Sequence, residues 1–217
     1  MKLFPFFLFP FFLFGALNEN GDFQVWNTDT LHVKMGRQTT LKGQTEFRYG
    51  RDGSKLYYKH YQGGVLFTCS PRTLLEFAYR HTYLRKDHKW GVVYNPLVDL
   101  TFQTQSRRGF YIGDRSRLQY LIFDKHLGHK GRWLYRNRLE IIPAVRLTRR
   151  KIAPFIADEI FWHEGRGIME NRAEIGLKIP YHQRTQLNLS YLYRNLKNLD
   201  KTWIHHNVLW VHFSLHF

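Results

Sequence analysis

The chain has 217 residues, and its 33 Lys and Arg against 17 Asp and Glu give a formal net charge of +16. This length suits one ordinary domain with a hydrophobic core. The single cysteine, Cys69, excludes an internal disulfide scaffold and a Cys-rich zinc site, and Lys and Arg spread over the whole chain argue against a compact nucleic-acid-binding patch.

The first segment, residues 1–19, has the pattern of a secretory signal peptide. Lys2 supplies a positive start, a run of Phe and Leu reaches Phe14, and Gly15 and Ala16 are small residues in a plausible cleavage zone. The apolar run is about twelve residues long, well short of the roughly twenty that a spanning helix needs. We therefore predict export, with cleavage between Gly15 and Asn20.

Residues 20–38 do not fit a simple pattern. The part from Asp22 to Lys34, which contains Trp26, has three open interpretations: a lead-in to the domain, a plug inside it, or a further hairpin. The hairpin would raise the strand count given below from about ten to twelve.

From residue 39 to 217 the dominant pattern is alternation of apolar and polar residues, which is typical of a two-faced β-strand. Leu209, Val211, Phe213 and Leu215, for example, alternate with Val208, Trp210, His212 and Ser214. The pattern predicts ten strands, at 39–50, 55–69, 72–86, 97–107, 110–124, 131–145, 150–162, 167–180, 184–194 and 204–217.

A transmembrane β-barrel and a soluble β-sandwich both alternate in this way, so further features must separate them. Strands of ten to fourteen residues are long for a sandwich and suit a tilted bilayer crossing. Aromatic residues, 17% of the chain, gather near predicted strand ends, where the girdles of a membrane barrel belong: Trp90, Tyr94, Trp133, Tyr135, Trp162, Tyr181, Tyr191, Tyr193 and Trp203. We therefore predict an all-β fold, an antiparallel transmembrane β-barrel in the bacterial outer membrane.

The connections give two further expectations. Tight turns are expected at residues 70–72 and 182–183, and longer polar loops at 87–96 and 195–203, which is the short-and-long alternation of outer-membrane barrels. An even number of strands would place both ends of the barrel on the periplasmic side. Phe213, Leu215 and Phe217 resemble the signal by which barrel-assembly machinery recognises a last strand.

Five short motifs carry a resemblance to a known family: Asp22-Phe23-Gln24-Val25-Trp26, Arg115-Ser116-Arg117-Leu118-Gln119, Arg136-Asn137-Arg138-Leu139-Glu140, Asp158-Glu159-Ile160-Phe161 and Asn171-Arg172. They resemble the family numbered 2490 in the domain-of-unknown-function series, from about residue 22 onward. Its members resemble outer-membrane barrels without an established activity, so the resemblance implies the fold and no catalytic residue.

If the apolar faces are turned outward, the other faces fill the interior with alternating acids and bases. We call the following twelve residues the charge lattice: Glu46, Arg48, Glu76, Arg80, Arg115, Arg117, Arg136, Arg138, Glu140, Glu159, Arg172 and Glu174. Lys42, Gln119, Glu170 and Lys178 are expected beside them. Arg and Glu on neighbouring strands form charge-assisted hydrogen bonds, which fill and hold a narrow barrel. An anion path along Arg115, Arg117, Arg136 and Arg138 is the alternative, which the nearby Glu residues oppose.

Enzyme chemistry finds less support. A lipid hydrolase needs a Ser beside a His, and the outward candidates, Ser116 and His81, fall on strands that are not adjacent in sequence. His212 and His216 are about 13 Å apart on an extended strand, and His205 and His206 point to opposite faces, so no metal site is expected.

We therefore predict a structural or small-solute transport barrel without a cofactor, with a lipid hydrolase as the alternative. A basic nucleic-acid-binding β protein is the second alternative, although aromatic and basic residues fall mostly on opposite strand faces. The expected partners are outer-membrane lipids, lipopolysaccharide and the barrel-assembly machinery, with no nucleic acid. The oligomeric state stays open.

Overall fold

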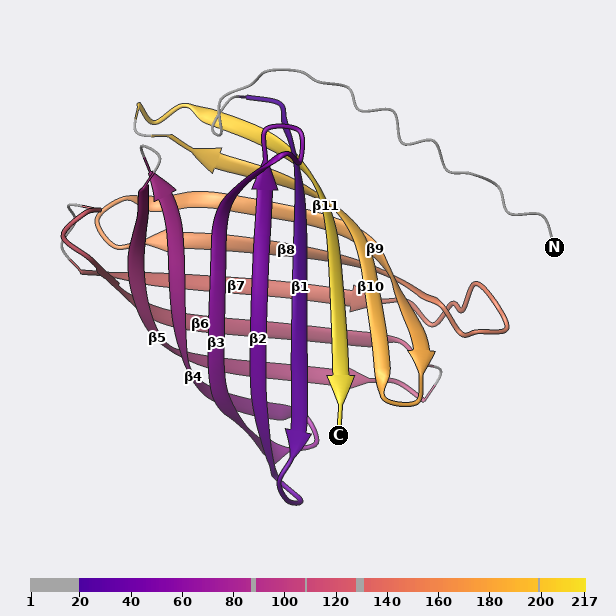
Figure 1. Ribbon diagram of the computed structural model, residues 1–217. Helices are drawn as coiled ribbons and strands as arrows, with labels where there is room; N and C mark the ends of the chain where they lie inside the picture. Colours follow the sequence, from indigo (N-terminus) through magenta and orange to yellow (C-terminus); the bar gives the residue numbers. More distant parts are fainter. Residues whose placement is uncertain (1–19, 87–88, 108, 128–130, 199) are drawn as a thin grey trace.

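The computed structural model describes residues 20–86, 89–107, 109–127, 131–198 and 200–217; the predicted signal peptide, residues 1–19, lies outside them. Within these ranges the chain forms one closed β-barrel of eleven strands (Figure 1). The strands are β1 Asp22–Lys34, β2 Thr39–Gly50, β3 Lys55–Ser70, β4 Thr73–Lys86, β5 Lys89–Gln105, β6 Tyr111–Phe123, β7 Arg132–Ile142, β8 Ala153–His163, β9 Gly167–His182, β10 Thr185–Lys197 and β11 Trp203–His216. In the described part of the chain, no helix is long and apolar enough to cross a membrane.

The barrel has the polarity that alternation predicts, with apolar side chains outside and polar ones inside. Exposed apolar side chains on the outer face include Phe23, Leu41, Phe77, Phe102, Leu118, Leu139, Ile156, Ile160, Ile175, Leu189 and Leu209. Buried interior side chains include Gln24, Glu46, His60, Gln62, Glu76, Asp99, Arg117, Glu159 and Arg172. The all-β barrel prediction is confirmed, and the arrangement inverts that of a soluble domain, whose apolar side chains face inward.

The strand count and the closure differ from the prediction. Neighbouring strands are antiparallel except at one place. There β1 lies parallel to β11, with Asp22 opposite His206 and His32 opposite His216. In Figure 1 the indigo β1 runs beside the yellow β11 in the same direction. Residues 22–34 are therefore the strand that closes the barrel, and the predicted totals of ten or twelve strands are wrong.

The pattern of β1 explains why it escaped the sequence analysis. Its outward face begins with Phe23 and Val25 but continues with Asn27 and Asp29, while its inward face carries the aromatic Trp26. Alternation in hydropathy is therefore lost in the middle of the strand, although alternation in direction is kept.

An odd strand count places the start of β1 and the end of β11 at opposite ends of the barrel, which corrects the expectation that both lie on one side. We call the end where β1 begins rim I and the end where it finishes rim II. Rim II has tight turns between β3 and β4 and between β9 and β10, but also the longer segment 143–152. The predicted separation of short turns from long loops is thus wrong.

Strand β5 is longer than predicted, since it begins at Lys89 and includes most of the expected loop 87–96. Gly91, Asn95 and Pro96 are residues typical of turns. They are nevertheless paired with β4, where Pro96 lies opposite Tyr79. On the β6 side pairing passes from Tyr94 to Leu97, because proline has no N–H to donate to a second ladder.

The interior contains two small chambers separated by a layer of arginines. The rim I chamber and the rim II chamber each have a volume of about 260 Å³. Both are bounded by Arg48, Arg80, Arg136 and Arg172, so these four side chains lie between them.

Candidate functional site

All twelve residues of the charge lattice lie on the interior faces of their strands, on β2, β4, β6, β7, β8 and β9. Glu46, Arg48, Glu76, Arg80, Arg117, Arg136, Glu159, Arg172 and Glu174 are buried, and Arg115, Arg138 and Glu140 are partly exposed. Strand parity explains this placement, because residues two apart share a face.

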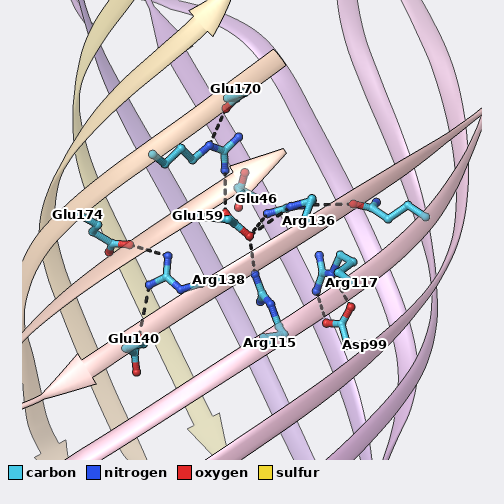
Figure 2. A network of polar contacts seen from close by, with 12 residues as sticks. Glu46, Asp99, Arg115, Arg117, Arg136, Arg138, Glu140, Glu159, Glu170 and Glu174 are labelled. Atoms are coloured by element: carbon cyan, nitrogen blue, oxygen red, sulfur yellow. Dashed lines mark hydrogen bonds and ion pairs between the residues drawn. The ribbon is translucent and has the colours of Figure 1, made fainter. Parts of the chain in front are cut away.

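Glu159 on β8 is the centre of the lattice (Figure 2). Its Oε1 accepts hydrogen bonds from Arg115 Nη2 at 2.7 Å and Arg136 Nη2 at 2.8 Å. Arg172 Nη1 lies 3.6 Å from its Oε2. One carboxylate, only 1% exposed, thus holds three guanidinium groups from β6, β7 and β9. Such charge-assisted bonds are the strong class of hydrogen bond, particularly away from water.

Three further carboxylates, Glu140, Glu174 and Glu170, lie on either side of Glu159. Toward rim II, Arg138 bridges Glu174 at 2.8 Å and Glu140 at 3.3 Å. Toward rim I, Glu170 accepts hydrogen bonds from Arg172 Nε at 2.6 Å and Arg194 Nε at 2.8 Å. The charges therefore form two ion-pair clusters, one around Glu159 and Glu170 and one around Arg138, and both link strands that are not neighbours.

Arg80 on β4 differs from the other basic members. Within the described ranges no carboxylate lies within 4 Å of its guanidinium, which donates from Nε and Nη2 to the neutral Gln62 Oε1 at 2.9 and 2.7 Å. Gln62 Nε2 in turn donates a hydrogen bond to Glu76 Oε1, and Lys42 Nζ donates one to Glu76 Oε2. Arg80 is thus a buried cation whose nearest partner is an amide.

Sequence reasoning missed several interior partners. Asp99 accepts two hydrogen bonds from Arg117, at 2.6 and 2.5 Å. It lies between the outward Val98 and Leu100, so alternation was a usable signal. Arg194, which pairs with Glu170, lies on the polar face of β10, so the same alternation could have identified it as an interior residue.

Trp26 gave no sequence signal for its position. It is fully buried against Leu192 and Val208, and the guanidinium carbon of Arg48 lies 3.7 Å from its ring centroid. That of Arg172 lies 4.8 Å away. Aromatic faces attract guanidinium groups, so Trp26 supports the arginine layer from one wall.

The interior near rim I contains an apolar cluster beside its charged side chains. Val93, Leu121, Leu134 and Phe161 are buried there and pack with Leu127, which follows β6. Asp124 fixes this segment, since its carboxylate accepts hydrogen bonds from the backbone N–H groups of Val92 and Leu127, at 2.6 and 3.0 Å. These bonds lower the pKa of Asp124 from its ordinary value, because they favour the charged carboxylate.

The outer face carries a short polar row in the middle of β6 to β9. Asn137 donates to Asp114 at 2.9 Å and to Ser116 at 3.3 Å, and Asn171 donates to Asp158 at 2.9 Å. Each of these polar side chains thus has a hydrogen-bonding partner within the row.

The structure does not bring the hydrolase candidates together. His81 lies opposite Tyr94 on β5, whereas Ser116 lies opposite Leu100 on the same strand. Six residues along a strand correspond to roughly 20 Å. Ser116 is instead hydrogen-bonded to Tyr135 at 2.9 Å, and His81 packs among tyrosine rings.

The remaining predicted residues are placed as follows. Phe213 and Leu215 lie on β11, and Phe217 follows it, with its backbone N–H bonded to His32 O at 2.8 Å. This geometry does not test the predicted role of these three residues in assembly. Among the residues that the structure describes, no group of three or more His, Cys, Asp or Glu is arranged to hold a metal ion.

We expect Glu140→Leu to destabilise the barrel by about 1–3 kcal/mol, the usual cost of leaving charged hydrogen-bonding partners unsatisfied. Glu140 accepts from Lys178 and Arg138, but Arg138 keeps Glu174 and the site is partly exposed, so the effect stays moderate. Unfolding in urea, with the protein in lipid vesicles, measures the change. Unaltered stability would mean that these pairs do not hold the barrel.

Comparison with known proteins agrees with the motifs found in the sequence. No curated protein matches the chain. The model of a family described as "Protein of unknown function (DUF2490)" matches residues 23–205, a range that runs from the second residue of β1 into β11. Since this match covers most of the chain, the protein belongs to the DUF2490 family.

Proposed function

We propose that this protein is an exported outer-membrane β-barrel whose interior is closed by the charge lattice, with a structural role rather than that of an open channel. One observation carries the proposal: a closed barrel with an apolar outer face around a charged interior. In water an outer face of this kind would be unfavourable, whereas hydrocarbon solvates it and a closed barrel leaves no strand edge unpaired.

The outer aromatic residues support a membrane setting. Tyr94, Trp133, Trp162, Tyr193 and Trp203 are exposed and lie near the strand ends at rim I. Amphipathic rings are favoured at the boundary between hydrocarbon and headgroups.

Lys59 fits the same boundary. Its ammonium lies 5.0 Å from the ring centroids of both Tyr83 and Trp90 on the outer face. A long basic side chain can place its stem along apolar surface and its charge near the headgroups.

Export and assembly rest on the sequence. The segment 1–19 has the composition of a signal peptide, which supports secretion. The outward alternation of Phe213, Leu215 and Phe217 supports recognition by barrel-assembly machinery. Outer-membrane lipids and lipopolysaccharide are the partners that such a barrel would contact.

The interior favours a closed barrel over an open path. The two chambers are small, and three of the four arginines between them, Arg48, Arg136 and Arg172, are paired with Glu46, Glu159 and Glu170. Small barrels are typically filled by side chains, and open channels belong to much larger ones. A lipid hydrolase is disfavoured by the separation of Ser116 from His81. Nucleic-acid binding is disfavoured because the lattice arginines face the interior.

The direct test is fractionation of cells that express the full chain. We expect the protein in the outer membrane, with heat-modifiable migration on gels and a β-rich circular dichroism spectrum. A folded membrane barrel resists unfolding by detergent until heated, whereas recovery as a soluble periplasmic monomer would refute the proposal.

The outward polar row gives a second test. Replacing Asp158 and Asn171 together by Leu should stabilise the protein in lipid vesicles by roughly 1 kcal/mol or more, because polar groups facing hydrocarbon are unfavourable even when paired. Urea titration in vesicles measures this, and Thr45→Leu, also on the outer face, serves as a comparison. A loss of stability in the double variant would place the row against something other than lipid.

A further inference from the structure

The rim I chamber has a composition that filling a barrel does not require. Its walls include Leu84, Val93, Leu121, Phe123, Leu134 and Phe161, all pointing into an interior that is elsewhere polar. The rim II chamber, of similar volume, is lined mainly by charged and polar side chains such as Lys42, Glu140 and Lys178. The barrel therefore holds one amphipathic chamber and one polar chamber.

The inner end of the amphipathic chamber is strongly basic. Arg48, Arg80, Arg136, Arg172 and Arg194 line it, and Glu170 is the acidic residue of its lining. Most of these arginines are engaged by carboxylates, as described above, but among the described residues Arg80 donates its hydrogen bonds to the amide of Gln62 instead. Arg80 is 6% exposed, and a buried cation that no carboxylate contacts directly is unfavourable, although the charges of Glu46 and Asp99 act on it from further away. At the inner end of the chamber, Arg80 therefore has no carboxylate of the described chain within 4 Å.

Side chains of the apolar cluster and two basic side chains lie at the outer end of the chamber. Leu127 packs so closely over Gly91 that a Cβ there would lie 2.5 Å from its side chain. Arg132 and His163 line the mouth, and the Arg132 guanidinium lies 4.9 Å from the ring centroid of Phe123. An apolar group inside is therefore sheltered from water by Leu127 and meets positive charge at both ends.

We propose that the rim I chamber binds a small organic acid, with one carboxylate on Arg80 and an apolar body between Leu121, Leu134 and Phe161. The volume of about 260 Å³ suits an aromatic or short-chain acid of modest size. A carboxylate gives Arg80 the charge-assisted hydrogen bonds that Gln62 does not supply. This binding goes beyond the structural role and does not depend on where the barrel resides.

The test uses the full chain, folded in detergent, and 4-fluorophenylacetate as the probe, observed by fluorine NMR with protein-free micelles as the blank. Its neutral isostere, 4-fluorophenylacetamide, has the same apolar body without the charge. We expect the acid to bind at least about tenfold more tightly than the amide, since a hydrogen bond to a buried charge is worth that much. Inorganic phosphate, which lacks an apolar body, should not displace the acid.

Two variants locate the site. Arg80→Gln should weaken binding of the acid by about tenfold and leave the amide unaffected. Lys178→Gln removes one positive charge from the polar chamber and should leave both ligands unaffected. Heat-modifiable migration checks that each variant is folded. If Arg80→Gln does not fold, the difference in affinity between acid and amide on the unmodified chain decides whether the chamber binds a carboxylate.

Four results would overturn the proposal: no binding of the acid up to about 10 mM, a concentration far above that expected for a specific site; equal affinity for acid and amide; equal losses in Arg80→Gln and Lys178→Gln; or displacement by phosphate, which would assign binding to the polar chamber. None of these would affect the proposed membrane location, which fractionation tests separately.

Discussion

Glu159→Gln is expected to lower the free energy of unfolding by about 3–5 kcal/mol, the typical cost of breaking a buried ion pair from one side. The substitution keeps the shape of the side chain but removes the charge that holds Arg115, Arg136 and Arg172. Three guanidinium groups would then share a buried site with no carboxylate of their own, apart from the bond of Arg172 to Glu170. Urea unfolding in lipid vesicles, followed by tryptophan fluorescence, measures the loss.

The neighbouring residue provides the control. Asp158 also belongs to β8 but faces outward, where it accepts a hydrogen bond from Asn171. Asp158→Asn makes the same isosteric change one residue away, and we expect it to alter stability by less than about 1 kcal/mol. Equal effects of the two substitutions would mean that interior and exterior charges are not distinguished, which contradicts the charge lattice.

The intact protein is expected to show no stable conductance in a planar bilayer, whereas a variant that lacks half of the arginine layer should conduct. Replacing Arg136, Glu159 and Arg172 together by Ser removes two of the four arginines between the chambers and the carboxylate that both contact. Removing acid and base together limits the number of unpaired charges left behind. The resulting path should prefer anions, because Arg48, Arg80, Arg115 and Arg194 remain along it.

A double variant serves as the control, because it distinguishes the opening of a path through the arginine layer from a general loosening of the barrel. Lys42→Ser combined with Glu76→Ser removes an ion pair of 2.8 Å on β2 and β4, outside the layer shared by both chambers. It should stay silent in the bilayer. Conductance of the unmodified chain would favour transport over a closed structural barrel.

Much of the fold could be predicted because each strand meets two different environments. The range 39–50 was predicted and is observed as β2, and the direction of every lattice side chain followed from parity. The failures occur where composition hides parity: Asn27 and Asp29 interrupt the apolar face of β1, and Gly91 and Pro96 disguise the start of β5 as a loop.

The partners inside the barrel could not be predicted in the same way. Parity assigns a residue to a face, but register decides which residues stand level on neighbouring strands. Arg138 lies opposite both Arg115 and Glu159 in the ladders, yet its 2.8 Å ion pair is to Glu174, one strand further. Arginine reaches across strands, so side-chain length as well as register selects the pairs, and the isolation of Arg80 is visible only in the folded barrel.

The parallel seam between β1 and β11 restricts how this chain can be rearranged. In a barrel with an even strand count the two ends meet at one rim, and a short linker can join them to make a circular permutant. Here a linker from the end of β11 to the start of β1 must run the height of the wall. At about 3.3 Å per residue, a strand of 13 residues such as β1 extends over roughly 40 Å. A circular permutant of this barrel therefore needs a much longer linker than one of a barrel whose two ends meet at the same rim.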